Sequence, residues 1–379
     1  MEYVIFGAGI LGRELLKKLG KENVKCFIDN DRNKQGMFLD EIPVYSYEYY
    51  KCQLSLYPII ICASWVNIFK IVEQLKQDYI DYKIYIPKLL EESPLISYGS
   101  SNQKSENEIK EEFKKNENKI YVREYVDKID IDNVPLFDSI EIETINRCNG
   151  LCSFCPVNVK NDIRELKKMD LNLFYKIIKE LEEMSYPGRV SLFSNNEPFL
   201  DNRIVELSQY AREHIKYAHI HMFTNGSLLN LDKYKNIIQY LDELIIDNYS
   251  DNLELHDNIR EIYEYIKNND DEKLKYKTKI LIRKQNEILT SRGGDAPNRT
   301  SYINVDNETC TLPFRQMIVR PDGKVSLCCN DPYGRETMGD LNEMTLKDVW
   351  YGNKYRELRE KIKIGRKNLQ HCKNCDTFM

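Results

Sequence analysis

Two stretches of the chain alternate short apolar runs with amphipathic, helix-like segments. In the first, the apolar runs YVIFGAG, VKCFIDND, PIIICAS and YKIYIP are separated by segments such as ILGRELLKKLG and NIFKIVEQLKQDY. Strands that alternate with helices predict a parallel sheet. We therefore expect a small Rossmann-like α/β unit over residues 1–90.

The second alternation begins at Phe137 and contains five apolar runs with four amphipathic segments between them. The runs are DSIEIETIN, RVSLFS, YAHIHMFTN, ELIIDNYS and KTKILIRK. Five strands with four intervening helices fit part of a (β/α)6 barrel, which we expect over residues 133–305. Residues 91–132 are polar and highly charged, so they predict a linker or an exposed helix.

The last segment, residues 306–379, has a different pattern. MIVRPDGKVSLCC reads as a β-hairpin with a DG turn, and MTLKDVWYGNKYRELREKIKIG reads as a helix. The whole chain is thus predicted to be α/β, with a parallel sheet, a partial barrel and a small hairpin-and-helix domain in that order.

Composition and charge exclude several classes of function. The 379 residues carry 55 Lys+Arg against 60 Asp+Glu, a net charge of -5, which does not favour a general nucleic-acid or membrane-surface binder. The N-terminus, MEYVIFGAGILG, lacks the basic start of a signal peptide. The longest apolar run is too short to cross a bilayer. We expect a cytoplasmic protein.

The eleven cysteines favour metal or redox chemistry in a cytoplasmic protein, where disulfides are rare. Cys148, Cys152 and Cys155 are spaced C-x3-C-x2-C just after the first barrel strand. Catalytic groups in barrels come from loops at these strand ends. Three thiolates are one short of a tetrahedral zinc site. Either a distant residue completes a zinc site, or the cysteines hold an iron–sulfur cluster with an open position.

The stretch CNGLCSFC resembles the signature of radical S-adenosylmethionine (SAM) enzymes. SNNEPFL, residues 194–200, ends the second barrel strand, where that family has a Gly-Glu-Pro motif, and TNG, residues 224–226, ends the third. Asn195 and Asn196 stand where the family usually has glycine; we expect the turn to survive, because asparagine tolerates positive φ. The resemblance runs from about residue 137 to the C-terminus.

This resemblance implies a cofactor and a reaction. Three thiolates hold a [4Fe–4S] cluster, and the amino and carboxylate groups of SAM bind the remaining iron. Electron transfer to SAM yields a 5′-deoxyadenosyl radical, which abstracts a hydrogen atom from an unactivated C–H bond. By position, the resemblance implies Cys148, Cys152 and Cys155 as cluster ligands, Glu197 near the SAM amino group, Ser194 and Asn225 near its ribose or carboxylate, and Phe154 near its adenine.

Four further cysteines, Cys310, Cys328, Cys372 and Cys375, supply the ligands of a closed [4Fe–4S] cluster or a zinc site. This part resembles the SPASM domain of radical SAM enzymes, in the shorter twitch form that holds one auxiliary cluster. Cys329 adjoins Cys328, and neighbouring residues of a strand face opposite ways. We therefore expect only one of the two to be a ligand, and the cysteine spacing favours Cys328.

The N-terminal GAGILG, residues 7–12, lies between a strand and a helix, as the dinucleotide-binding fingerprint requires. The candidate binding residues are Gly7, Gly9, Gly12 and Asp29, the acid at the end of the next strand. The unit also resembles Rossmann-like domains of bacterial sugar acyltransferases and polysaccharide-pathway enzymes, which implies a nucleotide or nucleotide-sugar ligand. A purely structural domain and NAD-dependent catalysis are the alternatives.

Three residues near the predicted barrel mouth are candidates for catalysis or substrate contact. Arg292 and Arg299 lie in the loop TSRGGDAPNR, and Asp247 ends the fourth barrel strand. Arginine binds carboxylates and phosphates well. The alternative is a turn-rich connector with solvated arginines.

We hypothesise a radical SAM oxidoreductase with SAM and two [4Fe–4S] clusters, reduced by an external flavodoxin or ferredoxin. Its substrate is expected to be a sugar, nucleotide sugar or aminocyclitol, which is dehydrogenated or epimerised. One alternative is a radical SAM peptide maturase. Another is a zinc-stabilised scaffold that binds nucleotide sugars without radical chemistry.

Overall fold

The computed structural model describes residues 2–63, 65–85, 95–99, 118–269 and 271–377, with the single residues 105, 107, 108, 111 and 115. The chain divides into two compact units, residues 1–91 and 92–379. None of the helices in these described ranges has the length and apolar character that a membrane span requires.

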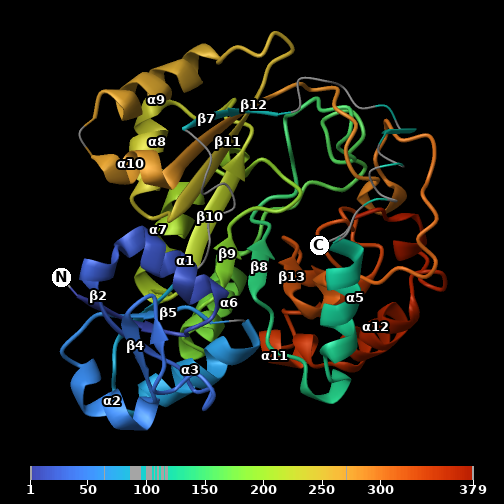
Figure 1. Ribbon diagram of the computed structural model, residues 1–379. Helices are drawn as coiled ribbons and strands as arrows, with labels where there is room; N and C mark the ends of the chain where they lie inside the picture. The colour runs from blue at the N-terminus through green and yellow to red at the C-terminus, as the bar shows by residue number, and fades with distance from the viewer. Residues whose placement is uncertain are drawn as a thin grey trace. The chain divides into compact units, whose positions relative to one another are not determined.

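The first unit is a six-stranded sheet in the order β3-β4-β2-β1-β5-β6 (Figure 1). Its parallel strands β1 (Tyr3–Phe6), β2 (Val24–Ile28), β5 (Ile59–Ile61) and β6 (Tyr82–Ile84) coincide with the four predicted apolar runs. The helices are α1 (Ile10–Leu19), α2 (Tyr47–Leu54) and α3 (Trp65–Gln77). The prediction of a parallel α/β unit is confirmed.

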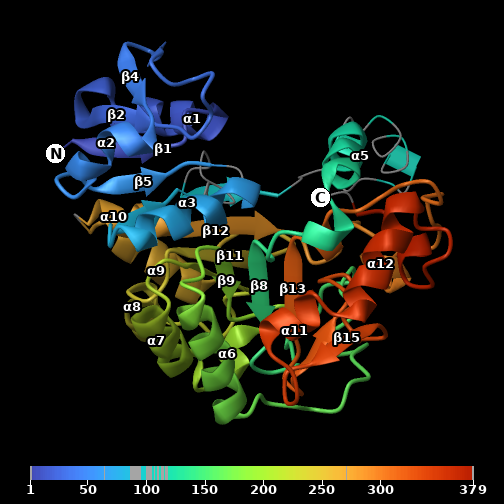
Figure 2. The same ribbon diagram turned by 90° about the horizontal axis from the view of Figure 1, so that it is seen from below.

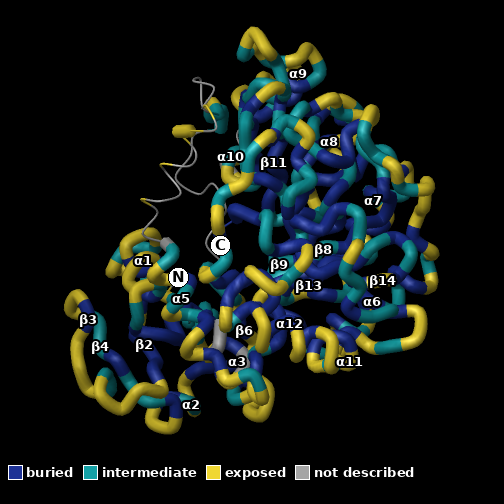
Figure 3. Tube along the Cα trace, turned by 90° about the vertical axis from the view of Figure 1, so that its right-hand side faces the viewer, coloured by how far each residue is buried: buried dark blue, intermediate teal, exposed yellow. Residues whose placement is uncertain are grey.

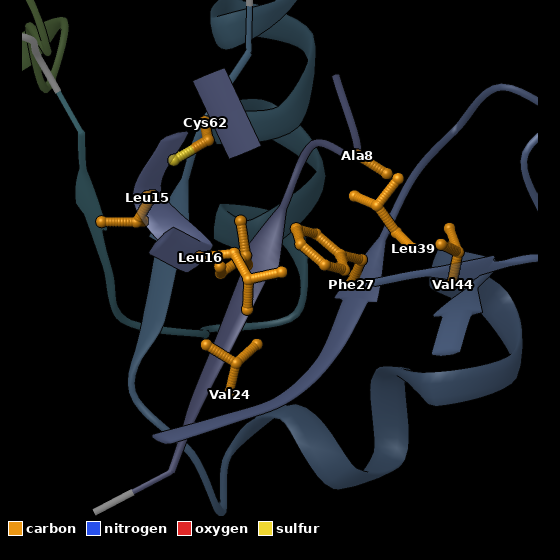
Figure 4. Packing of buried hydrophobic residues seen from close by; sticks show 9 residues of the cluster. Ala8, Leu15, Leu16, Val24, Phe27, Leu39, Val44 and Cys62 are labelled. Carbon is orange, nitrogen blue, oxygen red and sulfur yellow. The ribbon is translucent and has the colours of Figure 1, made fainter. Parts of the chain in front are cut away.

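A hairpin of β3 (Phe38–Leu39) and β4 (Ile42–Tyr45) was not predicted. Its turn residues Asp40 and Glu41 both have positive φ; aspartate is a common turn residue, but glutamate does not signal such a turn. The hairpin joins the core because β4 pairs in parallel with β2. Figure 4 shows that core, in which apolar residues of α1 pack with residues of β2 and β4 and with Cys62.

The second unit contains a nine-stranded sheet in the order β15-β14-β13-β8-β9-β10-β11-β12-β7. The five predicted barrel strands are parallel neighbours: β8 (Ser139–Ile142), β9 (Arg189–Ser191), β10 (His219–Thr224), β11 (Glu243–Tyr249) and β12 (Thr278–Arg283). The predicted intervening helices are α6 (Leu171–Glu183), α7 (Ile204–His214), α8 (Leu231–Ile238) and α9 (Asp257–Lys267), and α10 (Glu272–Lys277) follows them.

These helices lie side by side along one face of the strands (Figure 2). The strands are largely buried, whereas α7, α8 and α9 alternate between buried and exposed positions (Figure 3). This is the arrangement expected for a partial (β/α) barrel, whose helices cover only the outside.

The sixth parallel strand comes from an unexpected place. β7 (Ile96–Tyr98) pairs in parallel with β12, although it precedes the barrel in sequence and falls in the segment predicted as a linker. The same segment contains α5 (Asn118–Lys128) and the turn η2 (Ile131–Asn133). Most of residues 100–117 lie outside the described residues.

The cysteine-rich end extends the barrel sheet. β13 (Gln316–Val319) pairs in parallel with β8 and antiparallel with β14 (Lys324–Ser326), which pairs with β15 (Thr337–Asp340). The predicted hairpin is therefore confirmed, with Gly323 at positive φ in its turn. The predicted single helix is instead two helices, α11 (Leu346–Trp350) and α12 (Asn353–Ile364), because Gly352 starts a new helix as its N-cap.

Replacing Gly226 with alanine should destabilise the second unit. Gly226 has φ +71, and a Cβ there would lie 2.9 Å from side-chain carbons of Ile246 and Ile259. The left-handed backbone alone costs about 1–2 kcal/mol for alanine, and the clash adds to that cost. Urea unfolding of anaerobically purified protein measures the loss.

Gly36→Ala is the matched control, since Gly36 also has positive φ but a Cβ added there would have no atom within 4 Å. It should show the backbone cost alone. An equal loss of stability in both variants would contradict the packing role of Gly226.

Candidate active site

The first cysteine group lies in the loop that follows β8. Burial raises the thiol pKa of Cys148 and of Cys152 to about 12, and the neighbouring cysteines of the group add to the shift. A Cβ on Gly150 would lie 3.3 Å from Cys148 Sγ and 3.8 Å from Cys152 Sγ. The Gly150 N–H also donates to Cys148 Sγ at 3.3 Å. The thiols of Cys148 and Cys152 therefore lie beside Gly150, and Cys155 is close enough for its charge to raise the pKa of both.

Glu197 lies beside this loop and is almost fully buried. Its carboxylate accepts hydrogen bonds from Thr224 Oγ1 and from the Asn225 N–H, each at 2.7 Å. Burial raises the pKa of Glu197 to about 7 despite these bonds. Its negative charge in turn raises the thiol pKa of Cys148. The structure thus brings Glu197 and the first cysteine group together.

The turn before Glu197 forms without left-handed residues. Neither Asn195 nor Asn196 is among the residues with positive φ. The turn therefore survives as expected, but it needs neither glycine nor the left-handed conformation that asparagine tolerates. Instead, the Asn196 side chain closes it by accepting from the Ser194 N–H at 2.8 Å.

Asn225 and Phe154 also face the cysteine loop. Asn225 Nδ2 lies 2.9 Å from Asn149 Oδ1 and 3.9 Å from Cys148 Sγ. The Phe154 ring lies 6.1 Å from the Tyr249 ring, centroid to centroid, at the end of β11. Both residues therefore border the space beside the three thiols where the resemblance places SAM.

Asp247 belongs to this group rather than to the arginine loop. Burial raises its pKa to about 6, and Arg283, with Nη1 3.9 Å from Asp247 Oδ1, partly opposes the shift. The negative charge of Asp247 raises the pKa of both Cys152 and Glu197. Asp247 therefore lies close to the first cysteine group and Glu197.

The second cysteine group surrounds a small cavity. All four predicted ligands line it: Cys310, Cys328, Cys372 and Cys375. Burial raises the thiol pKa of Cys328 well above its usual value, and the other three cysteines contribute. Metal ligation supplies the positive charge that makes buried thiolates stable. This ligand set fits a cluster with four cysteine ligands.

Arg366 lines this cavity and hydrogen-bonds to the backbone around it. Its buried guanidinium donates to the carbonyl oxygens of Cys375, Thr309 and Thr377 at 2.5–2.8 Å. These bonds fix the backbone next to Cys310 and at Cys375. The positive charge of Arg366 lowers the thiol pKa of both Cys310 and Cys372, which partly opposes the effect of burial. A cationic wall suits a site that holds several thiolates.

The described residues contain no group of three or more His, Cys, Asp or Glu side chains arranged around a single metal ion. In a [4Fe–4S] cluster each thiolate binds a different iron. Such thiolates stand farther apart than the four ligands of one tetrahedral zinc, with Zn–S bonds of about 2.3 Å.

Hydrogen bonds and electrostatic coupling join a cluster of polar side chains close to Cys328 and Glu197 in the chain, and we call this cluster the polar recess: Glu141, Ser194, Asn195, Arg292, Gln316 and Cys329. Ser194 Oγ donates to Glu141 Oε2 at 2.6 Å, and Gln316 Nε2 donates to Glu141 Oε1 at 2.9 Å. Ser194 was expected near SAM, but its hydroxyl is directed to Glu141. Cys329 borders this cluster: its thiol is coupled most strongly to Glu141 and Arg292, and less strongly to Cys375 and Cys310.

Sequence reasoning missed Glu141 and Gln316. The signal for Glu141 was present in β8, where a polar residue separates Ile140 and Ile142, both fully buried. In a barrel such an alternation directs one set of side chains inward. Gln316 gave no comparable local signal.

The backbone at Arg292 adopts an unusual left-handed conformation. Arg292, Gly293 and Gly294 all have positive φ, a strained conformation for arginine. A Cβ on Gly293 would lie 2.2 Å from His371 Nε2, so the turn is pressed against the cysteine-rich domain. The Arg292 guanidinium donates to Asn195 Oδ1. The structure therefore directs this arginine into the polar recess.

Arg299 is held differently. Its buried guanidinium pairs with Asp376 at 2.9 Å and donates to the Leu289 carbonyl at 2.7 Å. Asp376 also accepts from the Ser291 N–H at 2.7 Å. Arg299 thus has a structural partner beside Cys375, and the structure does not bring it into the polar recess.

The glycine motif of the first unit forms a tight turn. A Cβ on Gly7 or Gly12 would meet backbone oxygen at 2.0 Å, whereas nothing lies within 4 Å of that position on Gly9. Asp29 Oδ2 accepts from the Ala8 N–H at 2.8 Å and pairs with Lys34 Nζ at 3.0 Å. The motif has the predicted local geometry, and the Asp29 carboxylate is already engaged by the protein.

Separate exchange of two adjacent cysteines tests the ligand assignment. Cys328→Ser should remove about four irons per chain, because Cys328 lines the second cavity. Cys329→Ser should leave the iron content unchanged, since its thiol faces the polar recess. Iron and sulfide analysis with electron paramagnetic resonance measures both. Iron loss in the Cys329 variant alone would reverse the assignment.

Comparison with known proteins agrees with this geometry. Residues 142–292 match the radical SAM superfamily, and residues 310–376 match the SPASM iron–sulfur cluster-binding domain. The chain is 27% identical over 244 residues to the S-adenosyl-L-methionine-dependent 2-deoxy-scyllo-inosamine dehydrogenase of Niallia circulans, covering 64% of this chain and 93% of the relative.

A crystal structure of BtrN in complex with AdoMet and 2-DOIA is similar, with a TM-score of 0.56 and 26% identity over 65% of this chain and 95% of that one. The two matching domains imply SAM and iron–sulfur clusters at both cysteine groups. The chain is therefore a radical SAM enzyme with a C-terminal SPASM-type domain.

Proposed function

We propose that this enzyme dehydrogenates an aminocyclitol or a closely related amino sugar, converting a ring CH–OH group to a ketone. The polar recess carries the proposal. It offers a carboxylate, a guanidinium, amides and a hydroxyl within one hydrogen-bonded cluster, which suits a small ring with several hydroxyl or amino groups. The similarity to a 2-deoxy-scyllo-inosamine dehydrogenase supports the same substrate class.

We propose a place for each cofactor from the residues around it. Cys148, Cys152 and Cys155 would hold the first [4Fe–4S] cluster, with Glu197, Asn225, Phe154 and Asp247 around SAM. Cys310, Cys328, Cys372 and Cys375 would hold the auxiliary cluster. When bound, the first cluster and SAM supply the radical that removes a hydrogen atom from carbon, and the auxiliary cluster supplies an acceptor for the second electron.

Arg292 is proposed to anchor the substrate. Its Nε is buried without a hydrogen-bond partner, and an unpaired buried donor is costly unless a ligand accepts from it. Because Gly293 packs against His371 and Gly294 against Asn374, the turn that carries the Arg292 guanidinium has little freedom to move away. A substrate hydroxyl that accepts from Nε would be held in one orientation.

The proximity of the two sites follows from the chain itself. Cys328 lines the auxiliary cavity and the next residue, Cys329, faces the polar recess. A substrate in the recess is therefore separated from an auxiliary ligand by little more than one residue. This adjacency favours an oxidation, in which a second electron has to leave the substrate, over a redox-neutral reaction.

We further propose an external flavodoxin or ferredoxin as reductant and a cytoplasmic location, which suits eleven cysteines that form no disulfide. For the first unit we keep a nucleotide or nucleotide sugar as the proposed ligand at Gly7, Gly9, Gly12 and Asp29. Its support is the strand–turn–helix geometry of the glycine motif. A bound ligand would have to share Asp29 with Lys34.

Anaerobic assays with SAM, dithionite and 2-deoxy-scyllo-inosamine test the proposed function. Equal amounts of 5′-deoxyadenosine and ketone are expected. Release of 5′-deoxyadenosine only with a peptide or a nucleotide sugar, and not with aminocyclitols, would contradict the substrate class. An epimerised product without ketone would contradict the oxidation.

Arg292→Gln should lower kcat/KM about 100-fold, because it removes a charged hydrogen bond to the substrate. Arg335→Gln is the matched control. Arg335 is exposed and pairs with Asp295, three residues beyond Arg292 in the same loop, so kcat/KM should stay within about twofold. Equal effects of the two changes would contradict substrate binding by Arg292.

A further inference from the structure

Glu141 is the central acidic group of the polar recess. It lies on β8 between two fully buried isoleucines, yet its own side chain keeps partial exposure. Each carboxylate oxygen accepts one bond, from Ser194 Oγ at 2.6 Å and from Gln316 Nε2 at 2.9 Å. A carboxylate oxygen has two lone pairs. Both oxygens therefore keep an acceptor position for a group in the recess.

The surroundings of Glu141 come from four other parts of the chain. Ser194 and Asn195 follow β9, Gln316 starts β13, Cys329 follows β14 and Arg292 lies in the turn η4 (Arg292–Gly294). Of these, Arg292 is the cation and Cys329 is titratable, with its pKa raised to about 12 by burial. No ion pair of Glu141 occurs among the described residues, so Arg292 acts on it only at longer range.

Two other buried glutamates show what distinguishes Glu141. Glu143 is locked in an ion pair with Arg164 at 3.1 Å, and Glu197 accepts from three donors beside the first cysteine group. Glu141 is held by neutral donors alone and borders the recess. Hydrogen bonds therefore fix the orientation of the Glu141 carboxylate, but no cation pairs with it among the described residues.

We propose that Glu141 accepts the proton of the substrate hydroxyl that is being oxidised. This role rests on the proposed function and deepens it. Oxidation of CH–OH to C=O removes one hydrogen atom, one electron and one proton. The atom and the electron leave to the SAM-derived radical and the auxiliary cluster. The substrate O–H bond breaks, and a new O–H bond forms on the Glu141 carboxylate.

The chemistry of the recess leaves few other acceptors. A guanidinium is protonated in proteins and has no lone pair to accept a proton, so Arg292 orients the hydroxyl but does not deprotonate it. Amides such as Asn195 and Gln316 are not bases. Burial raises the pKa of Glu141 to about 7, and the Ser194 bond and Arg292 partly oppose the shift. A base with that value exchanges protons readily near neutral pH.

The pH dependence of turnover tests the role with two variants. Wild-type kcat should fall as the pH drops through about 7, because the carboxylate must be ionised to accept a proton. Glu141→Gln keeps the shape and the hydrogen-bond acceptor but should lower kcat about 100-fold and remove this acid limb. Ser194→Ala should move the limb to higher pH, since it removes a bond that lowers the pKa.

A measurement without turnover gives an independent readout. Calorimetric titration of the unreduced, SAM-bound holoenzyme with 2-deoxy-scyllo-inosamine at pH 7, in buffers of different ionisation enthalpy, counts the protons exchanged. Binding should release protons from the wild-type protein, because a substrate hydroxyl that donates to Glu141 favours the ionised form. Glu141→Gln should bind within about threefold of wild type but lack this release.

The outcomes separate the two levels of the proposal. Suppose that the wild-type enzyme oxidises the substrate normally, and that Glu141→Gln keeps both the acid limb and the proton release. This result would overturn the role of Glu141 but not the proposed function. No oxidation of any aminocyclitol by wild type would refute the proposed function and the role of Glu141 with it. Iron content confirms that each variant carries its clusters, and Ser194→Ala keeps the test decisive if Glu141→Gln does not fold.

Discussion

β13 and β8 pair in parallel over four residues, from Gln316 opposite Ser139 to Val319 opposite Ile142. The pairing joins two parts of the chain about 175 residues apart and makes the cysteine-rich end continuous with the barrel sheet. In this register Ile318 lies opposite Glu141, and Gln316 comes within hydrogen-bond distance of that carboxylate. The β8–β13 pairing thus positions the cysteine-rich end that contains the auxiliary cavity. It also brings Gln316 and Glu141 together in the polar recess.

The loop after β12 holds the two sites together from the other side. Ser291 and Arg299 both bind Asp376, the neighbour of Cys375, and Gly293 packs against His371. Between these anchors the backbone turns through three left-handed residues and directs Arg292 toward Asn195. The strain of a left-handed arginine is tolerated because contacts on both flanks fix the turn. The cysteine-rich domain therefore shapes the substrate recess as well as binding its own cluster.

Local patterns were sufficient for much of this. Cysteine spacing identified both ligand groups, and the alternation of apolar runs predicted the parallel strands of both units. Glu197 and Asn225 were found because short motifs follow their strands. These features are encoded within a few residues, so a single sequence displays them.

The features that sequence reasoning missed depend on distant pairing. β7 has only three strand residues and gains stability by pairing with β12, which lies about 180 residues later. Ser194 was placed near SAM because nothing local shows that Glu141 accepts its hydroxyl. Arg299 was taken for a substrate residue, since its partner Asp376 is 77 positions away in the sequence. The polar recess as a whole is a product of tertiary structure.

Anomalous diffraction at the iron and zinc edges from an anaerobically grown crystal tests the central claim most directly. The account predicts two iron clusters, one bound by Cys148, Cys152 and Cys155 with one iron free of protein ligands, and one bound by Cys310, Cys328, Cys372 and Cys375. A zinc peak at either cysteine group, or iron at only one of them, would contradict it.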